Sequence, residues 1–192
     1  KGALSNAAEQ ALRAGQIIRR LRDFVAKGEA ERRIENLPKL LEEAGALAMI
    51  GAKERGVHLR FDIPRNIELV LADKVQVQQV VLNLMINGME AMTGQIAGER
   101  ILRIEAARTD GKACISIRDT GIGIPEDMLD KIFEGFYTTK AQGLGVGLEV
   151  CRSILESHHG SIWAEANPDR GATFHFTLPL LEEPAADSTT KV

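Results

Sequence analysis

The sequence predicts an α/β fold: a two-layer α/β sandwich in which helices cover one face of a mixed sheet, preceded by one long helix. Three observations support this class. Residues 57–63 alternate between apolar and polar side chains, as a strand with one buried face does. Residues 73–92 repeat apolar side chains at helical spacing. Residues 101–107 and 112–118 alternate again and are joined by Asp110-Gly111, a hairpin signal, so we expect antiparallel or mixed neighbours rather than a doubly wound sheet.

The first 30 residues are predicted to form a separate segment, with one helix over residues 3–27. Leu4, Ala11, Ile18 and Val25 recur every seven positions, and Ala7, Ala14 and Leu21 fill the positions three residues later. This short heptad pattern suits a tight helical bundle and predicts a homodimer through the N-terminal helix. A helix packed on its own domain is the alternative. Gly28 suits the helix end.

Residues 36–181 are predicted to form the main domain, of about five strands and three helices. Its first helix covers residues 38–53, because Pro38 suits a first helical turn. Strands follow at 57–63 and 69–71. Asp73 is a good N-cap, with Gln76 as its capping-box partner, for the helix over 73–92. After the hairpin we expect a short helix at 126–133, a loop at 134–145, a helix at 144–157 and final strands at 161–166 and 172–178. Residues 182–192 are predicted to be a disordered tail.

The composition argues against several classes of function. Hydrophobic residues make up 44% and charged residues 27%, an ordinary globular balance. The net charge is -3 and no basic stripe stands out, so nucleic-acid binding is not expected. No apolar run approaches the ~20 residues that span a membrane, and no membrane contact is expected of this segment. Cys114 and Cys151 lie in apolar segments, typical of reduced thiols in a cytoplasmic protein.

Several common sites are missing from the sequence. No phosphate-binding Gly-x-x-x-x-Gly-Lys-Ser/Thr loop occurs, and the glycines at 143–147 do not follow a strand as a dinucleotide-binding turn would. No Cys or His cluster has zinc spacing.

Two asparagines interrupt the apolar stretch of the helix over 73–92. Asn83 and Asn87 are four residues apart and therefore share one helical face. An Asn side chain can offer an oxygen to Mg²⁺ and an amide to a phosphate, and Mg²⁺ needs few protein ligands. The pair is interpreted as a magnesium and phosphate site, with Asn87 as the metal ligand. Two polar surface residues are the alternative.

Asp119 ends a predicted strand and precedes Gly121 and Gly123. A carboxylate there can accept from an adenine amino group, and glycines let the backbone approach the purine ring. An ordinary turn is the alternative.

A lid and a phosphate cradle are predicted beyond this turn. Phe133 and Phe136 suit either core positions or a hinged lid. Thr139 and Lys140 lie in the loop that follows, and Lys140 suits a γ-phosphate contact. Helix N-terminal amides at the glycine-rich segment form an anion site, and Thr173 could bond near the adenine. The residues of that segment are Gly143, Leu144, Gly145, Val146, Gly147 and Leu148.

Four motifs in fixed order resemble the N, G1, F and G2 boxes of the sensor histidine kinase catalytic domain, which has the Bergerat (GHKL) ATP-binding fold. They are NLMIN at 83–87, DTGIGIP at 119–125, FEGF at 133–136 and GLGVGL at 143–148. Four longer segments are similar to FixL-type kinases: ALRAGQIIRRLRDFVAKGE, LVLADKVQVQQVVLNL, TTKAQGLGVGL and GATFHFTLP.

The resemblance implies roles for these residues. Asn87 would hold Mg²⁺, Asn83 would support the phosphates, and Asp119 would bind adenine N6. Gly121 and Gly123 would line the ring, and residues 143–147 would line the phosphates of ATP. The helix at 1–30 would be the second helix of the dimerisation and histidine-phosphotransfer hairpin. Gly88 departs from the family, which more often has Ala there.

The resemblance also implies a reaction: transfer of the ATP γ-phosphoryl group to a histidine, and then to the aspartate of a response-regulator receiver domain. The acceptor histidine, followed by an acid, has no counterpart here. His58, His158, His159 and His175 lack that context and are interpreted as structural or surface residues. We therefore expect a fragment that binds Mg-ATP without phosphorylating itself, the acceptor lying in the phosphoacceptor domain of a parent kinase.

Two alternatives stay open. One is a GHKL-type ATPase, resembling gyrase or MutL, that hydrolyses ATP to drive conformational change. Those enzymes place a Glu base where this chain has Asn83, an amide that cannot act as a base. The other is a non-catalytic nucleotide-sensing dimer module.

Overall fold

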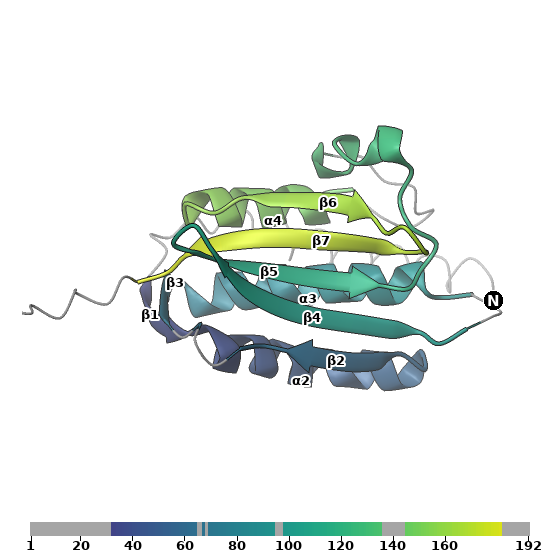
Figure 1. Cartoon of the computed structure of the whole chain (residues 1–192), viewed down its shortest axis with the longest axis horizontal. Coiled ribbons are helices and arrows are strands. Elements are labelled where there is room, and N and C mark those ends of the chain that lie inside the picture. The colour runs from purple at the N-terminus through teal and green to yellow at the C-terminus, as the bar shows by residue number, and fades with distance from the viewer. Residues whose placement is uncertain (1–31, 65–66, 68, 95–97, 136–144, 182–192) are drawn as a thin grey trace, which may run out of the picture. The chain divides into compact units, whose positions relative to one another are not determined.

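The fold is taken from a computed structural model, which describes residues 32–64, 67, 69–94, 98–135 and 145–181 (Figure 1). The predicted N-terminal helix and the predicted disordered tail lie outside these residues. Within them, the expected two-layer α/β sandwich with a mixed sheet is confirmed.

The main sheet has five strands in the order β2-β4-β5-β7-β6. β2 (His58–Asp62) runs parallel to β4 (Ile101–Thr109), and the other neighbours are antiparallel. The remaining strands are β5 (Lys112–Asp119), β6 (Ile162–Ala166) and β7 (Ala172–Pro179). Asp110 and Gly111 both have positive φ, 50° and 75°, so the β4–β5 connection is the tight hairpin that the sequence predicts.

Three helices cover one face of the sheet: α2 (Leu37–Glu54), α3 (Lys74–Ala91) and α4 (Gly147–Ser157) (Figure 1). α2 starts where Asn36 Oδ1 accepts from the Lys39 amide at 2.9 Å. The predicted cap of α3 is confirmed, because Asp73 Oδ1 accepts from the Gln76 amide at 3.1 Å. Each side-chain cap satisfies an amide that has no partner within its own helix.

Three details differ from the sequence prediction. A short strand β1 (Arg33–Asn36) pairs with β3 (Leu69–Ala72) in a separate two-stranded sheet. The expected helix at 126–133 is two 3₁₀ turns, Glu126–Met128 and Lys131–Phe133. The last helix begins at Gly147 rather than at residue 144, since Gly145 has φ of 69° and breaks the helical path.

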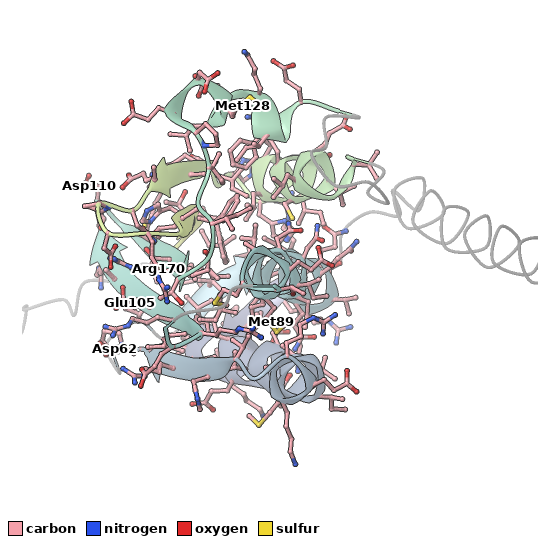
Figure 2. All side chains as sticks on the ribbon, turned by 90° about the vertical axis from the view of Figure 1, so that its right-hand side faces the viewer. Asp62, Met89, Glu105, Asp110, Met128 and Arg170 are labelled. Atoms are coloured by element: carbon pink, nitrogen blue, oxygen red, sulfur yellow. The ribbon has the colours of Figure 1, made fainter. Side chains whose placement is uncertain are left out.

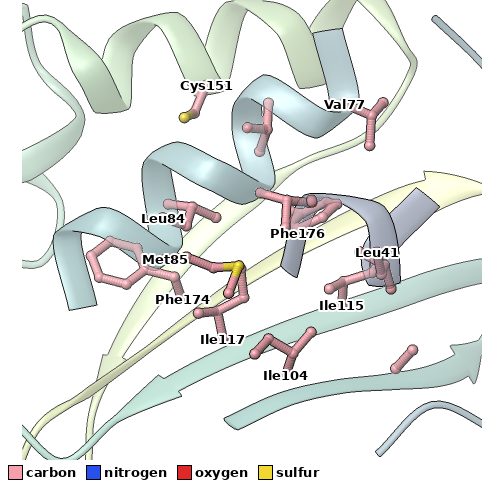
Figure 3. Packing of buried hydrophobic residues seen from close by; sticks show 14 of the residues in the cluster. Leu41, Val77, Leu84, Met85, Ile104, Ile115, Ile117, Cys151, Phe174 and Phe176 are labelled. Carbon is pink, nitrogen blue, oxygen red and sulfur yellow. The ribbon is translucent and has the colours of Figure 1, made fainter. Parts of the chain in front are cut away.

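The core lies between the helices and the sheet (Figure 3). Leu84 and Met85 of α3 face Ile117 and Phe174 of the central strands, and all four are at least 95% buried. α3 therefore lies over the middle of the sheet. This packing sets where the polar residues of α3 lie relative to the ends of the strands.

The other face of the sheet carries polar and aromatic side chains. Ser116 Oγ lies 2.8 Å from His175 Nδ1, and the Trp163 indole stacks on the His175 ring with centroids 5.0 Å apart. Strand alternation places these residues opposite Ile117 and Phe174.

Candidate functional site

Asp119 is the last residue of β5 and only 2% of it is exposed. Its Oδ1 accepts from the Gly121 amide at 2.7 Å and from the Ala172 amide at 3.4 Å. Burial raises the pKa of this carboxyl, while the two backbone hydrogen bonds act in the opposite direction. Because both amides reach Oδ1, Oδ2 is left to accept from an amino group of a ligand.

Glycine is required at two positions after Asp119. A Cβ at Gly121 would lie 2.7 Å from Asp119 Oδ1 and 2.8 Å from the carbonyl oxygen of Ala91. Gly123 has φ of 78°, and a Cβ there would lie 3.1 Å from the Gly171 carbonyl oxygen. The Ile122 amide donates to Ala91 O at 3.2 Å. The segment is thereby held against the end of α3, with its backbone open to close approach by a flat ring.

The β6–β7 turn packs directly against the end of β5. Asn167 Nδ2 donates to the main-chain oxygens of Asp119 at 3.0 Å and Arg170 at 3.1 Å. Asn167 Oδ1 accepts from Thr173 Oγ1 at 2.6 Å. A Cβ on Gly171, which has φ of 83°, would overlap Asp119 O. The predicted site residue Thr173 pairs with Arg118 in the β5–β7 ladder, so its side chain lies on the open face of the sheet, opposite the carboxylate of Asp119.

Two arginine contacts also hold the β6–β7 turn against neighbouring segments. Arg170 Nη2 donates to the Glu99 carbonyl oxygen at 2.8 Å, and Arg170 is labelled in Figure 2. Arg118 Nη2 lies 2.7 Å from Asp169 Oδ1, an exposed ion pair. The pair contributes little to stability in water.

Asn83 and Asn87 both lie on α3, one helical turn apart and half-buried. Asn83 Nδ2 donates to Gly147 O at 2.7 Å and lies 3.3 Å from Cys151 Sγ, so it reaches the first turn of α4. Gly88, next to Asn87, packs against Asp119: a Cβ there would lie 3.3 Å from Asp119 Cβ. α3 therefore runs from the start of α4 to the end of β5.

Cys151 is buried beside Asn83, and burial raises the pKa of its thiol to about 12. The thiol stays protonated at neutral pH and serves as a weak partner of the Asn83 amide.

The start of α4 meets the FEGF segment. Gly145, Val146, Gly147 and Leu148 are half-buried there, and Val146 is the N-cap residue. A Cβ at Gly135 would lie 2.6 Å from Glu149 Oε2. Phe133 is 3% exposed, meets Phe174 edge to face at 6.3 Å and lies under Arg152. Phe133 is therefore a core residue that packs against Phe174 of β7 and Arg152 of α4.

Five predicted site residues lie outside the residues that the structure describes: Phe136, Thr139, Lys140, Gly143 and Leu144.

Metal binding in the described part of the chain cannot rest on a cluster of acidic, Cys or His ligands, because no group of three or more is found there. Asn87 can offer one neutral oxygen, which suits an ion that keeps most of its ligands as water and phosphate oxygens. Among the same residues, no helix is long and apolar enough to cross a membrane.

Comparison with known families agrees with this geometry. Residues 72–182 match the family described as "Histidine kinase-, DNA gyrase B-, and HSP90-like ATPase". The match covers more than half of the chain, from the cap of α3 to the end of β7. The chain belongs to this ATPase family.

Within this ATPase family, the curated relatives include sensor kinases. The chain is 52% identical to the sensor protein FixL of Bradyrhizobium diazoefficiens over 95% of its own length and 36% of that protein. It is 38% identical to the C4-dicarboxylate transport sensor protein DctS of Rhodobacter capsulatus, over 92% of the chain and 27% of that protein. The chain thus spans about a quarter to a third of the length of these relatives.

Solved structures of this ATPase family have the same fold. The catalytic domain of histidine kinase ThkA is 32% identical with a TM-score of 0.70, covering 78% of the chain and 96% of that domain. ThkA in complex with response regulator protein TrrA matches with a TM-score of 0.74 and 28% identity, over 91% of the chain and 49% of that chain.

Sequence reasoning misses two residues of this candidate site. Asn167 is predicted only as part of a turn, although an Asn followed by Pro is a turn signal that often bonds nearby backbone. Gly171 is predicted only as the end of that turn, and its contact with Asp119 is non-local. The pairing of Asn83 with Gly147 also gives no sequence signal, since it depends on how two helices cross.

Proposed function

We propose that the chain binds Mg-ATP between α3, the end of β5 and the start of α4. Asp119 is the observation that carries the proposal: a buried carboxylate with one oxygen held by backbone amides and the other left for the purine amino group. Gly121 and Gly123 line the ring, and the 145–148 segment faces the phosphates.

Asn87 is the residue proposed to hold Mg²⁺, which supplies neutralisation of phosphate charge when bound. Asn83 supports the phosphate side from the same face of α3. Its side-chain amide donates to Gly147 O, so Asn83 also holds the start of α4 in position. The predicted roles of Phe136, Thr139, Lys140, Gly143 and Leu144 remain proposals of the same site.

The reaction proposed for the whole kinase is transfer of the γ-phosphoryl group to a histidine of its phosphoacceptor domain, followed by transfer to a receiver-domain aspartate. The chain's residues bind and orient ATP for in-line attack and need no covalent intermediate of their own. Further proposals are a cytoplasmic location, where ATP is supplied, and a homodimer through the helix predicted in residues 1–30, apart from the ATP-binding domain at 36–181.

Calorimetry with ADP and Mg²⁺ tests the site, comparing the chain with Asp119→Asn. Binding by the unaltered chain and its loss in the variant are expected; equal binding by both overturns the site. Radiolabelled ATP tests the reaction. We expect no acid-labile label on this chain alone, and label on an added acceptor-histidine hairpin of the parent kinase. Steady ATP turnover that Asn83→Ala abolishes would favour a hydrolase instead.

A further inference from the structure

We propose that the outward face of α2 is a self-association surface, on which a second copy of the chain docks with its own α2 running in the opposite direction. This inference goes beyond the proposed function and does not depend on nucleotide binding. It rests on an exposed apolar stretch of α2, on the charges that border this stretch and on the spacing between them.

The outward face of α2 is apolar in the second half of the helix. Leu47, Met49 and Ile50 are 63%, 54% and 73% exposed, and Ala46 is exposed beside them. A helix that already packs its inner face against a core normally carries charged and polar residues on the other face. Exposed apolar residues gathered in one place are instead typical of an interaction surface. α2 is accessible for this role, because it lies at the edge of the helix layer, beside α3 (Figure 1).

α3 extends this apolar surface. Near the start of the two helices, Glu43 Oε2 lies 2.6 Å from Lys74 Nζ. Near their ends, a Cβ on Gly51 would lie 4.0 Å from Met89 Cε. The helices therefore run side by side in the same direction. Ile86 of α3, 43% exposed and about one turn before Met89, adds to the surface next to the apolar half of α2.

Opposite charges border the apolar stretch at equal distances. Glu43 lies three residues before Ala46, and Lys53 lies three residues after Ile50. These four residues follow one another at spacings of three, four and three positions, so they form one stripe along the helix.

This stripe is complementary to itself when a second α2 lies antiparallel to the first. A two-fold axis midway between Ala46 and Ile50 places Ala46 opposite Ile50 of the partner subunit, so a small residue meets a large one. The same axis places Glu43 opposite Lys53 of the partner subunit, and the reverse pair follows by symmetry. A parallel arrangement would place each residue against its own copy, so like charges would meet twice.

Glu43 is already oriented at the helix surface. Its Oε2 lies 2.6 Å from Lys74 Nζ and 2.9 Å from Gln78 Nε2, both on α3. The hydrogen bond with Lys74 lowers the pKa of the Glu43 carboxyl, so this group is ionised at neutral pH. Its Oε1 can then accept from Lys53 of the partner subunit. Such an exposed pair selects the direction of the helices more than it adds affinity.

The pairing is expected to be weak on its own. A single helix offers less area than a stable interface needs, which corresponds to a dissociation constant on the order of 100 μM. A tether between two chains, such as the helix pairing proposed for residues 1–30, would raise the occupancy of this surface by holding two copies at roughly millimolar effective concentration.

Sedimentation equilibrium of the full chain measures the association. Because residues 1–30 are proposed to associate as well, each variant also carries Ile18→Glu, which interrupts the heptad pattern. The Ile18→Glu chain should still form dimers. Ile50→Glu should raise the dissociation constant by at least about tenfold, because a charge then replaces an apolar contact at the centre of the stripe. Ile34→Glu, which changes the same residue type at a 64% exposed position of β1, is the matched control and should leave the constant unchanged.

Cysteine cross-linking tests the direction of the helices. In a Cys114→Ser background, chains with Ala46→Cys and chains with Ile50→Cys are mixed and oxidised; the remaining thiol, Cys151, is buried. Antiparallel pairing predicts a disulfide-linked dimer in the mixture and none in either chain alone. Electrophoresis without reductant separates the two results.

A chain with Ile18→Glu that stays monomeric far above the expected dissociation constant overturns the inference and leaves this face to a different partner. An unchanged constant in Ile50→Glu overturns it equally, as does cross-linking of each cysteine chain to itself but not in the mixture. Urea unfolding checks that each variant folds, and Leu47→Glu repeats the test if Ile50→Glu does not. The proposed nucleotide site stands in all of these outcomes, because no variant alters it.

Discussion

Asn83 on α3 donates its side-chain amide to the main-chain oxygen of Gly147, the first residue of α4, at 2.7 Å. The bond joins the NLMIN segment of α3 to the first turn of α4. A Cβ on Gly147 would lie 3.0 Å from this amide nitrogen, so the small residue lets the helices come this close.

Asn83→Ala should therefore destabilise the chain as well as weaken nucleotide binding. Removal of the amide leaves a partly buried carbonyl without its side-chain partner, which costs about 1–3 kcal/mol. Urea unfolding measures the loss of free energy, and calorimetry with Mg-ADP measures the binding. Val75→Ala, at an exposed position of the same helix, is the control and should change neither. Unchanged stability in Asn83→Ala would show that the bond does not hold α4.

The charge of Asp119 should make stability depend on pH. Burial raises its folded pKa above 3.8, so the folded chain binds a proton more readily than the unfolded chain does. The free energy of unfolding is then expected to fall as pH rises from below 3.8 through the raised pKa. Asp119→Asn removes this contribution and should raise Tm at pH 7 by about 2–4 °C, the effect of roughly 1 kcal/mol in a chain of this size.

Asp110→Asn is the control for that experiment, because this residue lies on the exposed β4–β5 turn with φ of 50°, which Asn tolerates. Thermal unfolding at several pH values should give parallel curves for the control and the unaltered chain. If the curve for Asp119→Asn is also parallel to these two curves, the burial of the Asp119 charge does not affect stability.

Nucleotide affinity should fall in acid for the same reason. A purine amino group bonds the ionised carboxylate, and protonation of Asp119 removes that acceptor. Affinity for Mg-ADP, once corrected for protonation of the nucleotide itself, is therefore expected to decrease as pH falls through the raised pKa, with proton release on binding in that range. Calorimetry in two buffers of different ionisation enthalpy detects the proton. Binding without proton release there would contradict the assignment of Asp119.

Gly171 and Gly111 allow a matched comparison. Both have positive φ, 83° and 75°, so each Ala substitution carries the left-handed backbone cost of about 1–2 kcal/mol. A Cβ at Gly111 meets nothing within 4 Å, whereas one at Gly171 overlaps Asp119 O. Gly171→Ala should thus destabilise the chain by at least about 1 kcal/mol more than Gly111→Ala. Of the two variants, only Gly171→Ala should impair ADP binding. Equal effects of the two would show that the turn moves freely away from Asp119.

We expect His158 to be a structural histidine, because its replacement leaves the Asp73 amide without its hydrogen-bond acceptor. It is 1% exposed; its Nε2 accepts from the Asp73 amide at 2.9 Å, and its Nδ1 lies 2.8 Å from Ile154 O. Nδ1 must carry the proton, since the carbonyl can only accept. His158→Phe should cost about 1–3 kcal/mol of unfolding free energy. His159→Asn, at an exposed residue with φ of 58°, should cost far less in the same urea titration.

The sequence predicts the layers and most elements because their signals are local. The Asp73 cap, the Asp110-Gly111 turn and the alternating strands each depend on residues near one another in the chain. β1 escapes prediction because its four residues, RIEN, become a strand only by pairing with β3, about 35 positions further on. The 126–133 segment has the pattern of one helix but is divided into two 3₁₀ turns.

The candidate site, like the fold, can be predicted from the sequence only where its residues are close together in the chain. Asp119, Gly121 and Gly123 stand together in one motif, so their meeting needs no tertiary knowledge. The contact of Asn83 with Gly147 and that of Asn167 with Asp119 arise from helix crossing and strand pairing. Such contacts between distant segments leave no trace in a single sequence, although each partner can be recognised as polar or small.

The stacked pair on the open face of the sheet has a practical consequence. Trp163 is the only tryptophan in the chain, and its ring lies against His175 in the middle of β6 and β7. Its fluorescence therefore reports on the integrity of these two strands and needs no added dye. The loss of this fluorescence can be used to follow unfolding of the variants discussed above, since the substitutions at Asn83 and Asp119 leave Trp163 and His175 unchanged.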